Sequence, residues 1–292
     1  MAGPAFHDRD GKIWFDGELV DWRAANVHIL THAMHYASSV FEGERAYNGE
    51  IFKLREHTER LFESGRMLGF EIPYSTDEVD AASVAALEAN GLAEAYVRPV
   101  AWRGSEMMGV NAQGTEIHLA VAAWEWPNIF TEEQRLKGVT LSWAPWKRPS
   151  PDTIPACSKA AGLYMICTLS KHDAEAKGFN DALMLDWRGY VAEATGANVF
   201  FVKGDAIHTP IPDAILDGIT RRTVIGLAEE RGFKVYERRI TPDELEAFDE
   251  CFLTGTAAEV SPVARIENVE FPSREAASVL MPAYTKLVRR ES

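Results

Sequence analysis

Four short segments in the second half of the chain carry side chains of the types that perform covalent and acid–base chemistry. They are residues 154–164, 191–198, 217–222 and 255–259. In the first of them, Lys159 precedes the small residues 160–162, which would let a planar group approach the backbone. A lysine that is kept from water has a lowered pKa and can form an imine with an aldehyde. Taken alone, Lys159 is more simply interpreted as a solvated surface group.

Two further side chains could contact the same planar group. Glu193 lies among apolar and small residues, where a carboxylate is costly to bury unless a partner such as a protonated ring nitrogen is present. From this segment alone, a glutamate that faces water at a strand end is an equally good interpretation. Tyr164, five residues after Lys159, would bring a hydroxyl group to the same ring.

The remaining two segments have the features of anion-binding turns. Residues 218–222 open a predicted helix, so the free amides of Ile219 and Thr220 and the Thr220 hydroxyl favour an anion at one point. Ordinary N-capping by Thr220 is the simpler alternative. Thr256 follows a predicted strand and a glycine, as in a phosphate-binding turn. Together the four segments supply the groups that pyridoxal 5'-phosphate requires.

Composition and charge exclude several other classes of protein. The 292 residues include 44 acidic and 30 basic side chains, and the net charge of −14 disfavours a nucleic-acid partner. No window approaches 18 uninterrupted apolar residues, and the N-terminus lacks the pattern of a secretory signal, so we expect a cytoplasmic protein without membrane contact. Three cysteines without CxxC spacing predict a reducing compartment and no disulfide or zinc site.

A metal site and the common nucleotide and hydrolase sites are also disfavoured. His28, His32 and His35 have helical spacing, but no acidic ligand accompanies them, so we expect them to pack and form hydrogen bonds. The sequence has no Walker loop, GxGxxG run or GxSxG elbow.

The order of predicted elements favours two α+β domains over a regular βαβ fold. We expect a small N-terminal domain over residues 1–123, a connection over residues 124–136, and a large domain over residues 137–292 that carries Lys159. Asp16-Gly17 and Asn48-Gly49 predict β-hairpins. Further predicted elements are helices at residues 55–68, 75–90, 160–177, 220–231 and 273–289 and a short helix that begins with residues 241–244. Strands are predicted at 95–102, 116–124, 139–143, 182–186, 190–192, 198–202, 234–240 and 251–253.

With these residues identified, the chain resembles the fold-type IV pyridoxal phosphate enzymes (the D-amino acid aminotransferase-like fold), and most closely the bacterial branched-chain amino acid aminotransferases. The resemblance runs over nearly the whole chain. It rests on ordered matches at residues 35–43, 57–61, 96–99, 108–111, 123–126, 159–164, 193–198, 216–221 and 255–259.

The resemblance implies a role for each of these residues. Lys159 would be the Schiff-base lysine and proton carrier, Glu193 would pair with the pyridine nitrogen, and Tyr164 would contact the phenolate oxygen. The residues implied to bind phosphate are Arg60, Ile219, Thr220 and Thr256. Those implied to bind the substrate carboxylate are Tyr36, Arg98 and the amides of Thr256 and Ala257, and those around its side chain are Phe41, Trp126 and the partner subunit's Val110.

The resemblance further implies transfer of the amino group from branched-chain L-amino acids to 2-oxoglutarate, giving L-glutamate by a ping-pong mechanism. It implies a homodimer as the minimal unit, with a hexamer as an alternative, and a loop at residues 104–114 that reaches the partner. One pocket must then accept both an aliphatic side chain and a carboxylate. Arg98 is the candidate for a cation that moves to allow this. Arg103 would bind the glutamate side chain or pair with Glu106, and residues 127–130 depart from the family pattern.

Four alternatives remain open at this point. D-amino acid aminotransferases and (R)-selective amine transaminases share the cofactor-binding residues, and so does aminodeoxychorismate lyase. A non-enzymatic binding protein would be expected to have lost at least one chemical position, and this chain has lost none.

Overall fold

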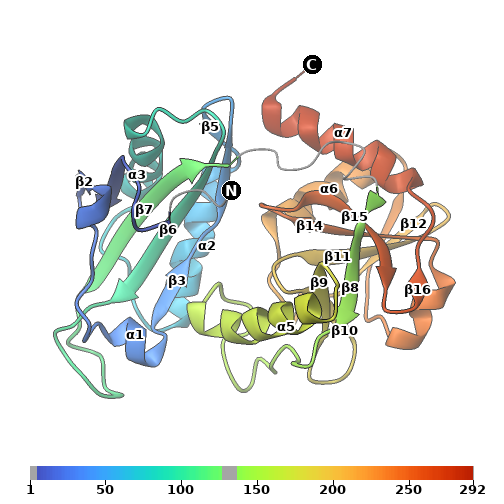
Figure 1. Cartoon of the computed structure of the whole chain (residues 1–292), viewed down its shortest axis with the longest axis horizontal. Helices are drawn as coiled ribbons and strands as arrows, with labels where there is room; N and C mark the ends of the chain where they lie inside the picture. The colour runs from blue at the N-terminus through green and yellow to red at the C-terminus, as the bar shows by residue number, and fades with distance from the viewer. Residues whose placement is uncertain (1–4, 127–136, 292) are drawn as a thin grey trace. The chain divides into compact units, whose positions relative to one another are not determined.

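The computed structural model describes residues 5–126 and 137–291, which belong to two compact units. The first unit is Met1–Pro127 with Ser158–Gly162, and the second is Asn128–Cys157 with Leu163–Ser292. Each unit combines helices with a β-sheet (Figure 1), which confirms the predicted α+β class. None of the helices in the described ranges is long and apolar enough to span a membrane.

The first unit is built on a seven-stranded antiparallel sheet in the order β2-β1-β7-β6-β4-β5, with β3 also paired to β6. Its two predicted hairpins are confirmed. Asp16 and Gly17 have φ of 45° and 101°, and Asn48 and Gly49 have φ of 52° and 85°, as type I′ turns require. The strands are β1 (Lys12–Phe15), β2 (Glu18–Asp21), β3 (Ser39–Phe41), β4 (Glu44–Tyr47), β5 (Glu50–Ile51), β6 (Ala95–Arg103) and β7 (Ile117–Glu125).

Helices α2 (Leu54–Met67) and α3 (Thr76–Ala89) cover one face of this sheet (Figure 1). The predicted capping box begins α3, because Ser75 Oγ accepts the Glu78 amide at 3.2 Å and the Glu78 carboxylate accepts the Ser75 amide at 2.6 Å. Leu61 and Val79 pack with Ala101 in the core between the helices and the sheet. Short helices η1 (Trp22–Ala24) and α1 (His32–Tyr36) lie between β2 and β3 in the chain.

The second unit contains a nine-stranded sheet in the order β10-β9-β8-β15-β14-β11-β12-β13, with β16 also paired to β15. Because β10 also pairs with β11, six of these strands form a closed ring around a core that includes Leu183, Phe201 and Val263. The strands are β8 (Val139–Trp143), β9 (Asp181–Leu185), β10 (Val191–Ala194), β11 (Asn198–Lys203), β12 (Ala206–Thr209), β13 (Lys234–Glu237), β14 (Glu250–Gly255), β15 (Glu259–Ile266) and β16 (Val269–Glu270). Its helices are η2 (Ala161–Leu163), α5 (Tyr164–Ala176), α6 (Ile219–Glu230), η3 (Pro242–Ala247) and α7 (Glu275–Arg289).

The structure differs from the expected elements in several places. The predicted helix at 160–177 begins only at Tyr164, because residues 159 and 160 are hydrogen-bonded to β3 in extended form. Strand β15 was not predicted, since Pro262 in its middle argues against a strand. Strand β7 continues to Glu125, two residues into the expected connection, and residues 127–136 of that connection lie outside the described ranges. The sequence departure at residues 127–130 lies outside them as well.

Candidate active site

Lys159 is held against the first unit by its backbone. Its carbonyl accepts the Phe41 amide at 3.2 Å, and its amide donates to Ser64 Oγ at 3.0 Å. Lys159 was expected in the large second domain, but these bonds attach residues 158–162 to β3 and α2. The side chain is half-buried, and its Nζ lies 4.9 Å from the centre of the Phe41 ring. A primary amine is therefore held beside an aromatic face.

Arg98 lies on the other side of the same aromatic cluster. Its guanidinium carbon is 4.7 Å from the centre of the Phe41 ring and 5.2 Å from that of Tyr96, and one guanidinium nitrogen donates to Tyr96 Oη at 3.4 Å. Arg98 Nε is buried and has no hydrogen-bond partner among the described residues. A half-buried cation with a spare donor beside apolar rings is suited to bind a carboxylate that carries a hydrophobic side chain.

Tyr96 connects Arg98 to Trp126, since the Tyr96 and Trp126 ring centres are 4.9 Å apart. The structure thus brings together Phe41, Arg98 and Trp126, three of the predicted substrate residues. Tyr96 itself was not among the predicted site residues. The alternation of β6 could have identified it, because residues 96 and 98 of a strand face the same side.

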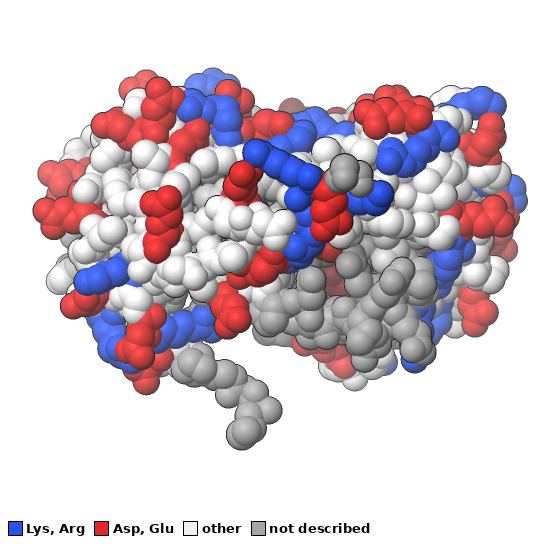
Figure 2. Space-filling view, turned by 90° about the horizontal axis from the view of Figure 1, so that it is seen from above, with Lys and Arg blue, Asp and Glu red and all other residues white. Residues whose placement is uncertain are grey.

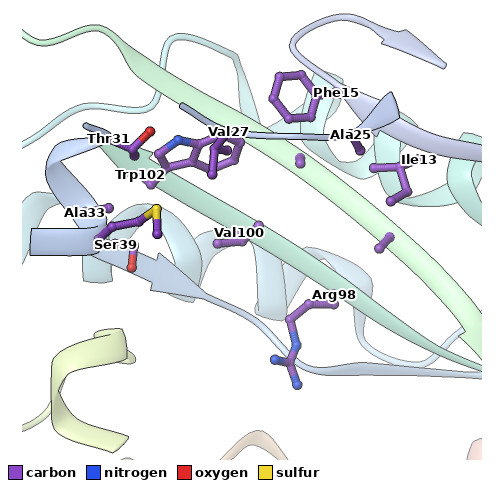
Figure 3. Close-up of a pocket in the computed structure, with 13 residues that line it drawn as sticks. Ile13, Phe15, Ala25, Val27, Thr31, Ala33, Ser39, Arg98, Val100 and Trp102 are labelled. Atoms are coloured by element: carbon purple, nitrogen blue, oxygen red, sulfur yellow. The ribbon is translucent and has the colours of Figure 1, made fainter. Parts of the chain in front are cut away.

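A cavity of about 380 Å³ adjoins Arg98 on the sheet face opposite to α2 and α3. In Figure 3, Val27, Thr31 and Trp102 lie at one end of it and Arg98 at the other. Val27 and Met34, which also line the cavity, are 48% and 58% exposed, so the face presents apolar surface to solvent in the isolated chain.

Arg60, a predicted phosphate-binding residue, forms an ion pair with a buried carboxylate. Its Nε lies 2.7 Å from Glu42 Oε1, and a terminal nitrogen lies 2.8 Å from Glu42 Oε2. His57 Nδ1 is 2.7 Å from the same Oε2. Burial alone would raise the pKa of Glu42, but the charge and hydrogen bonds of Arg60, together with His57, hold that pKa well below its ordinary value.

His57 and Glu44 remain uncharged around this pair. Burial lowers the pKa of His57 despite its bond to Glu42, so its neutral ring donates the Nδ1 proton to the carboxylate. Glu44 is fully buried, and its oxygens have no hydrogen-bond partner within the described part of the chain. Burial, with the charges of Glu42 and Asp80, raises the pKa of Glu44 well above its ordinary value. The Glu42 carboxylate is therefore a fixed anion that orients Arg60.

In the second unit, Glu193 lies on β10, is 8% exposed and has Arg148 and Asn198 among its polar neighbours. Arg148 Nε lies 3.2 Å from Glu193 Oε1, and Asn198 Nδ2 donates to Glu193 Oε2 at 3.2 Å. The water-facing alternative for Glu193 is therefore wrong. Arg148 was not predicted from the sequence, because 45 residues separate it from Glu193 and only the sheet brings them together.

Three of the four segments with candidate functional residues, 191–198, 217–222 and 255–259, approach one another around Asn198. Besides Glu193, its side-chain amide donates to the Leu216 carbonyl at 2.9 Å, and its Oδ1 would lie 2.2 Å from a Cβ at Gly218. A Cβ at Gly255 would lie 3.3 Å from the Gly196 carbonyl. Glycine at 218 and 255 thus allows these turns to approach closely.

Thr220 is not the N-cap of α6, so the N-capping alternative for this residue is wrong. Gly218 is the N-cap and makes no side-chain capping bond, so the first-turn amides of Ile219 and Thr220 have no side-chain partner at that position. Both residues are buried, which favours an anion over water as the partner. Thr256 is half-buried and Ala257 is exposed in the turn between β14 and β15.

The other predicted residues are placed as follows. Tyr164 is the half-buried first residue of α5. Tyr36 is 44% exposed and stacks on His32, with the ring centres 4.5 Å apart. Val110 is 89% exposed and makes no substrate pocket within its own chain. His28, His32 and His35 all form hydrogen bonds to protein groups, as expected.

Arg103 does not make the predicted pair with Glu106. It donates to the carbonyls of Ala112 and Gly69 at 2.8 and 2.7 Å. Glu106 instead accepts the Glu116 amide at 2.9 Å. The reason is that Arg103 is buried at the end of β6, where carbonyl groups are the nearest acceptors.

The residues of each unit fit parts of pyridoxal phosphate. A buried carboxylate beside Arg148 suits a protonated ring nitrogen, and the uncapped, buried first turn of α6 suits a phosphate. In the first unit, Lys159 supplies the amine and Arg60 a cation.

On the face in Figure 2, Lys and Arg side chains are mixed with Asp and Glu, and no continuous basic surface suited to nucleic acid is seen among the described residues.

Comparisons with known proteins agree on one family. The model of the family described as amino-transferase class IV matches residues 39–266. The branched-chain-amino-acid aminotransferase of Pseudomonas aeruginosa is 45% identical over 265 residues, which are 89% of this chain and 86% of that protein. Its counterpart from Escherichia coli K12 is 37% identical over 88% of this chain and 85% of its own length.

A solved structure shares both the fold and the extent of the chain. The T.th. branched-chain amino acid aminotransferase with pyridoxamine 5'-phosphate superposes with a TM-score of 0.94 at 38% identity. The match covers 97% of this chain and 96% of that one.

The Arg148–Glu193 pair gives a prediction about stability. Arg148→Met should lower the free energy of unfolding by about 3 kcal/mol, because the Glu193 carboxylate would be left buried without its counter-ion. In a Glu193→Gln background the same change should cost about 1.5 kcal/mol less. Urea denaturation of the four proteins measures this coupling, with Arg231→Met as a control in a solvent-accessible ion pair. Strictly additive effects would show that the pair does not interact.

Proposed function

This chain belongs to the class IV aminotransferase family, and we propose that it transfers the amino group of leucine, isoleucine and valine to 2-oxoglutarate. The products are the branched 2-oxo acids and L-glutamate, and the cofactor is pyridoxal 5'-phosphate. The observation that carries the substrate class is the cluster around Arg98, where a half-buried cation lies near the rings of Phe41 and Tyr96. Such a cluster fits an amino acid with a carboxylate and an aliphatic side chain.

We propose that Lys159 and Glu193 perform the acid–base work. Bound pyridoxal phosphate would supply an aldehyde that takes the amino group and a ring that takes up the electron pair released at the substrate α-carbon. Lys159 Nζ would remove the α-proton and return a proton during amino transfer. Glu193, which lies beside Arg148, would accept a hydrogen bond from the protonated ring nitrogen. Tyr164 would donate its hydroxyl proton to the phenolate oxygen.

The phosphate would be bound by the amides of Ile219 and Thr220 at the start of α6, with Thr256 and Arg60 as further donors. Support for Arg60 comes from its bidentate bond to Glu42, which fixes the direction of the guanidinium. Fixing these donors before the cofactor arrives lowers the entropy cost of binding it.

Substrate recognition is proposed to use polar and apolar groups together. Arg98, Tyr36 and the amides of Thr256 and Ala257 would bind carboxylate groups. Phe41, Trp126 and the partner subunit's Val110 would contact the aliphatic side chain. A ping-pong enzyme must accept a second carboxylate in place of that side chain, and the free Nε of Arg98 makes it the candidate cation for this exchange.

We propose a homodimer as the minimal unit, with a hexamer as an alternative, and a cytoplasmic location, which suits three unpaired cysteines. Support for the dimer comes from the apolar cavity face around Val27 and Met34 and from Val110, which is exposed in one chain.

The dimer gives a prediction about Met34. Met34→Glu should produce monomers in multi-angle light scattering, because it places a charge on the proposed apolar interface. Met165→Glu, at a methionine that is 64% exposed in the second unit, is the matched control and should leave the assembly unchanged. A Met34→Glu protein with unchanged mass would contradict this interface.

Two related activities are the alternatives. A D-amino acid or (R)-amine transaminase would share the cofactor-binding groups, but an amine has no carboxylate to occupy Arg98. A lyase such as aminodeoxychorismate lyase would need no 2-oxo acid as second substrate. A non-enzymatic protein would have no use for a lysine, a buried glutamate and an uncapped helix N-terminus together.

The donor specificity separates these activities. The visible absorbance of the loaded enzyme should be lost on adding L-leucine without any oxo acid, and should return with 2-oxoglutarate. D-alanine and (R)-1-phenylethylamine should change it at least about a hundredfold more slowly, a difference of about 3 kcal/mol in the barrier. Bleaching by D-alanine or the amine, or turnover without 2-oxoglutarate, would contradict the proposed function.

A further inference from the structure

The loop that joins β6 to β7, residues 104–116, is held by buried polar groups of its own unit. Arg103 donates through one guanidinium nitrogen to the Ala112 carbonyl at 2.8 Å and to Thr115 Oγ1 at 3.1 Å. Its other terminal nitrogen donates to the Gly69 carbonyl, beyond the end of α2, at 2.7 Å. One side chain that is 7% exposed therefore ties the returning half of the loop to the turn that follows α2.

His32 holds the tip of the same loop. Its Nε2 lies 2.9 Å from the Gly109 carbonyl, and since a carbonyl only accepts, Nε2 carries the proton. Its Nδ1 lies 2.7 Å from Ser38 Oγ. The His32 ring also stacks on Tyr36, and its amide donates to the Gly104 carbonyl at the base of the loop at 2.7 Å. His32 thus connects both the base and the tip of the loop to α1.

The loop is held by hydrogen bonds although two of its apolar side chains are exposed in the isolated chain. Val110 is 89% exposed and Met108 is 46% exposed, while the adjoining Gly109 carbonyl is bonded to His32. Burying a guanidinium group costs desolvation free energy. Such a cost is not expected for a surface loop that has no function. The three acceptors of Arg103 are all uncharged, so the gain lies in the shape of the loop and not in a charge pair.

We propose that Arg103 and His32 are positioning residues that hold residues 104–116 in the shape that presents Val110 to the substrate side chain in a second copy of the chain. This inference rests on the proposed function and dimer. A loop ordered before assembly loses little further entropy when the substrate binds. Loss of either residue should therefore weaken substrate binding and leave the chemical step at Lys159 nearly unchanged.

Arg103→Met is the principal test, because it keeps an apolar chain beside Phe70, whose ring centre lies 5.4 Å from the Arg103 guanidinium carbon, and removes every donor. Arg103→Lys keeps the charge but cannot reach both carbonyls in the same geometry, so it should restore part of the effect. Arg66→Met is the matched control, since Arg66 is 71% exposed near the end of α2 and pairs only with Glu63 in the described structure. His32→Gln tests the tip independently.

Two measurements on the holoenzyme decide the outcome. Hydrogen exchange of the loop amides should become about tenfold or more faster in Arg103→Met, with the helix α3 amides unchanged. The KM for L-leucine should rise about fivefold or more while kcat stays within about twofold. Arg66→Met should change neither quantity.

Each alternative result has a definite meaning. Unchanged loop exchange in Arg103→Met would overturn the positioning role. Faster exchange with an unchanged KM would show that the loop does not contact the substrate, and would overturn the link to Val110. If the parent enzyme does not turn over L-leucine at all, the proposed function fails instead, and that failure is seen without any variant.

Discussion

The structure depends on keeping carboxylates ionised away from water. A buried carboxylate without a counter-ion is so unfavourable that it takes up a proton, and then it can no longer orient a cation or a protonated ring. Each unit solves this problem with an arginine. Arg60 holds Glu42 in the first unit, and Arg148 lies beside Glu193 in the second. Glu44, which has no such partner, is the counter-example, because its pKa is raised.

The two units place their functional groups with two different sheets. In the first unit an antiparallel sheet with helices on one face puts Phe41, Tyr96 and Arg98 on neighbouring strands, so that aromatic rings surround a cation. In the second unit the closed ring of strands brings together turns from distant segments, with Asn198 bonded to two of them. Rigid strands thus support the turns that carry the polar groups, which is how a binding site keeps its geometry.

Much of the fold could be predicted from local patterns in the sequence. The Asp16-Gly17 and Asn48-Gly49 turns and the Ser75 capping box depend on contacts within a few residues, and each was predicted correctly. The family and the chemical class followed from several ordered segments that individually had simpler explanations. Partners distant in sequence were not predictable in this way, because the Arg148–Glu193 pair depends on the register of the sheet. Arg103 shows the same limit, since its acceptors are backbone carbonyls, which no residue type reveals.

The central claim is that Lys159 carries the cofactor, and reduction of the loaded enzyme with borohydride tests it most directly. Reduction makes an imine between lysine and pyridoxal phosphate permanent, and peptide mass mapping then locates it. We expect a single phosphopyridoxyl group on the peptide that contains Lys159, and none after L-leucine has removed the aldehyde. A stable adduct on another lysine, or none on the loaded enzyme, would contradict the claim.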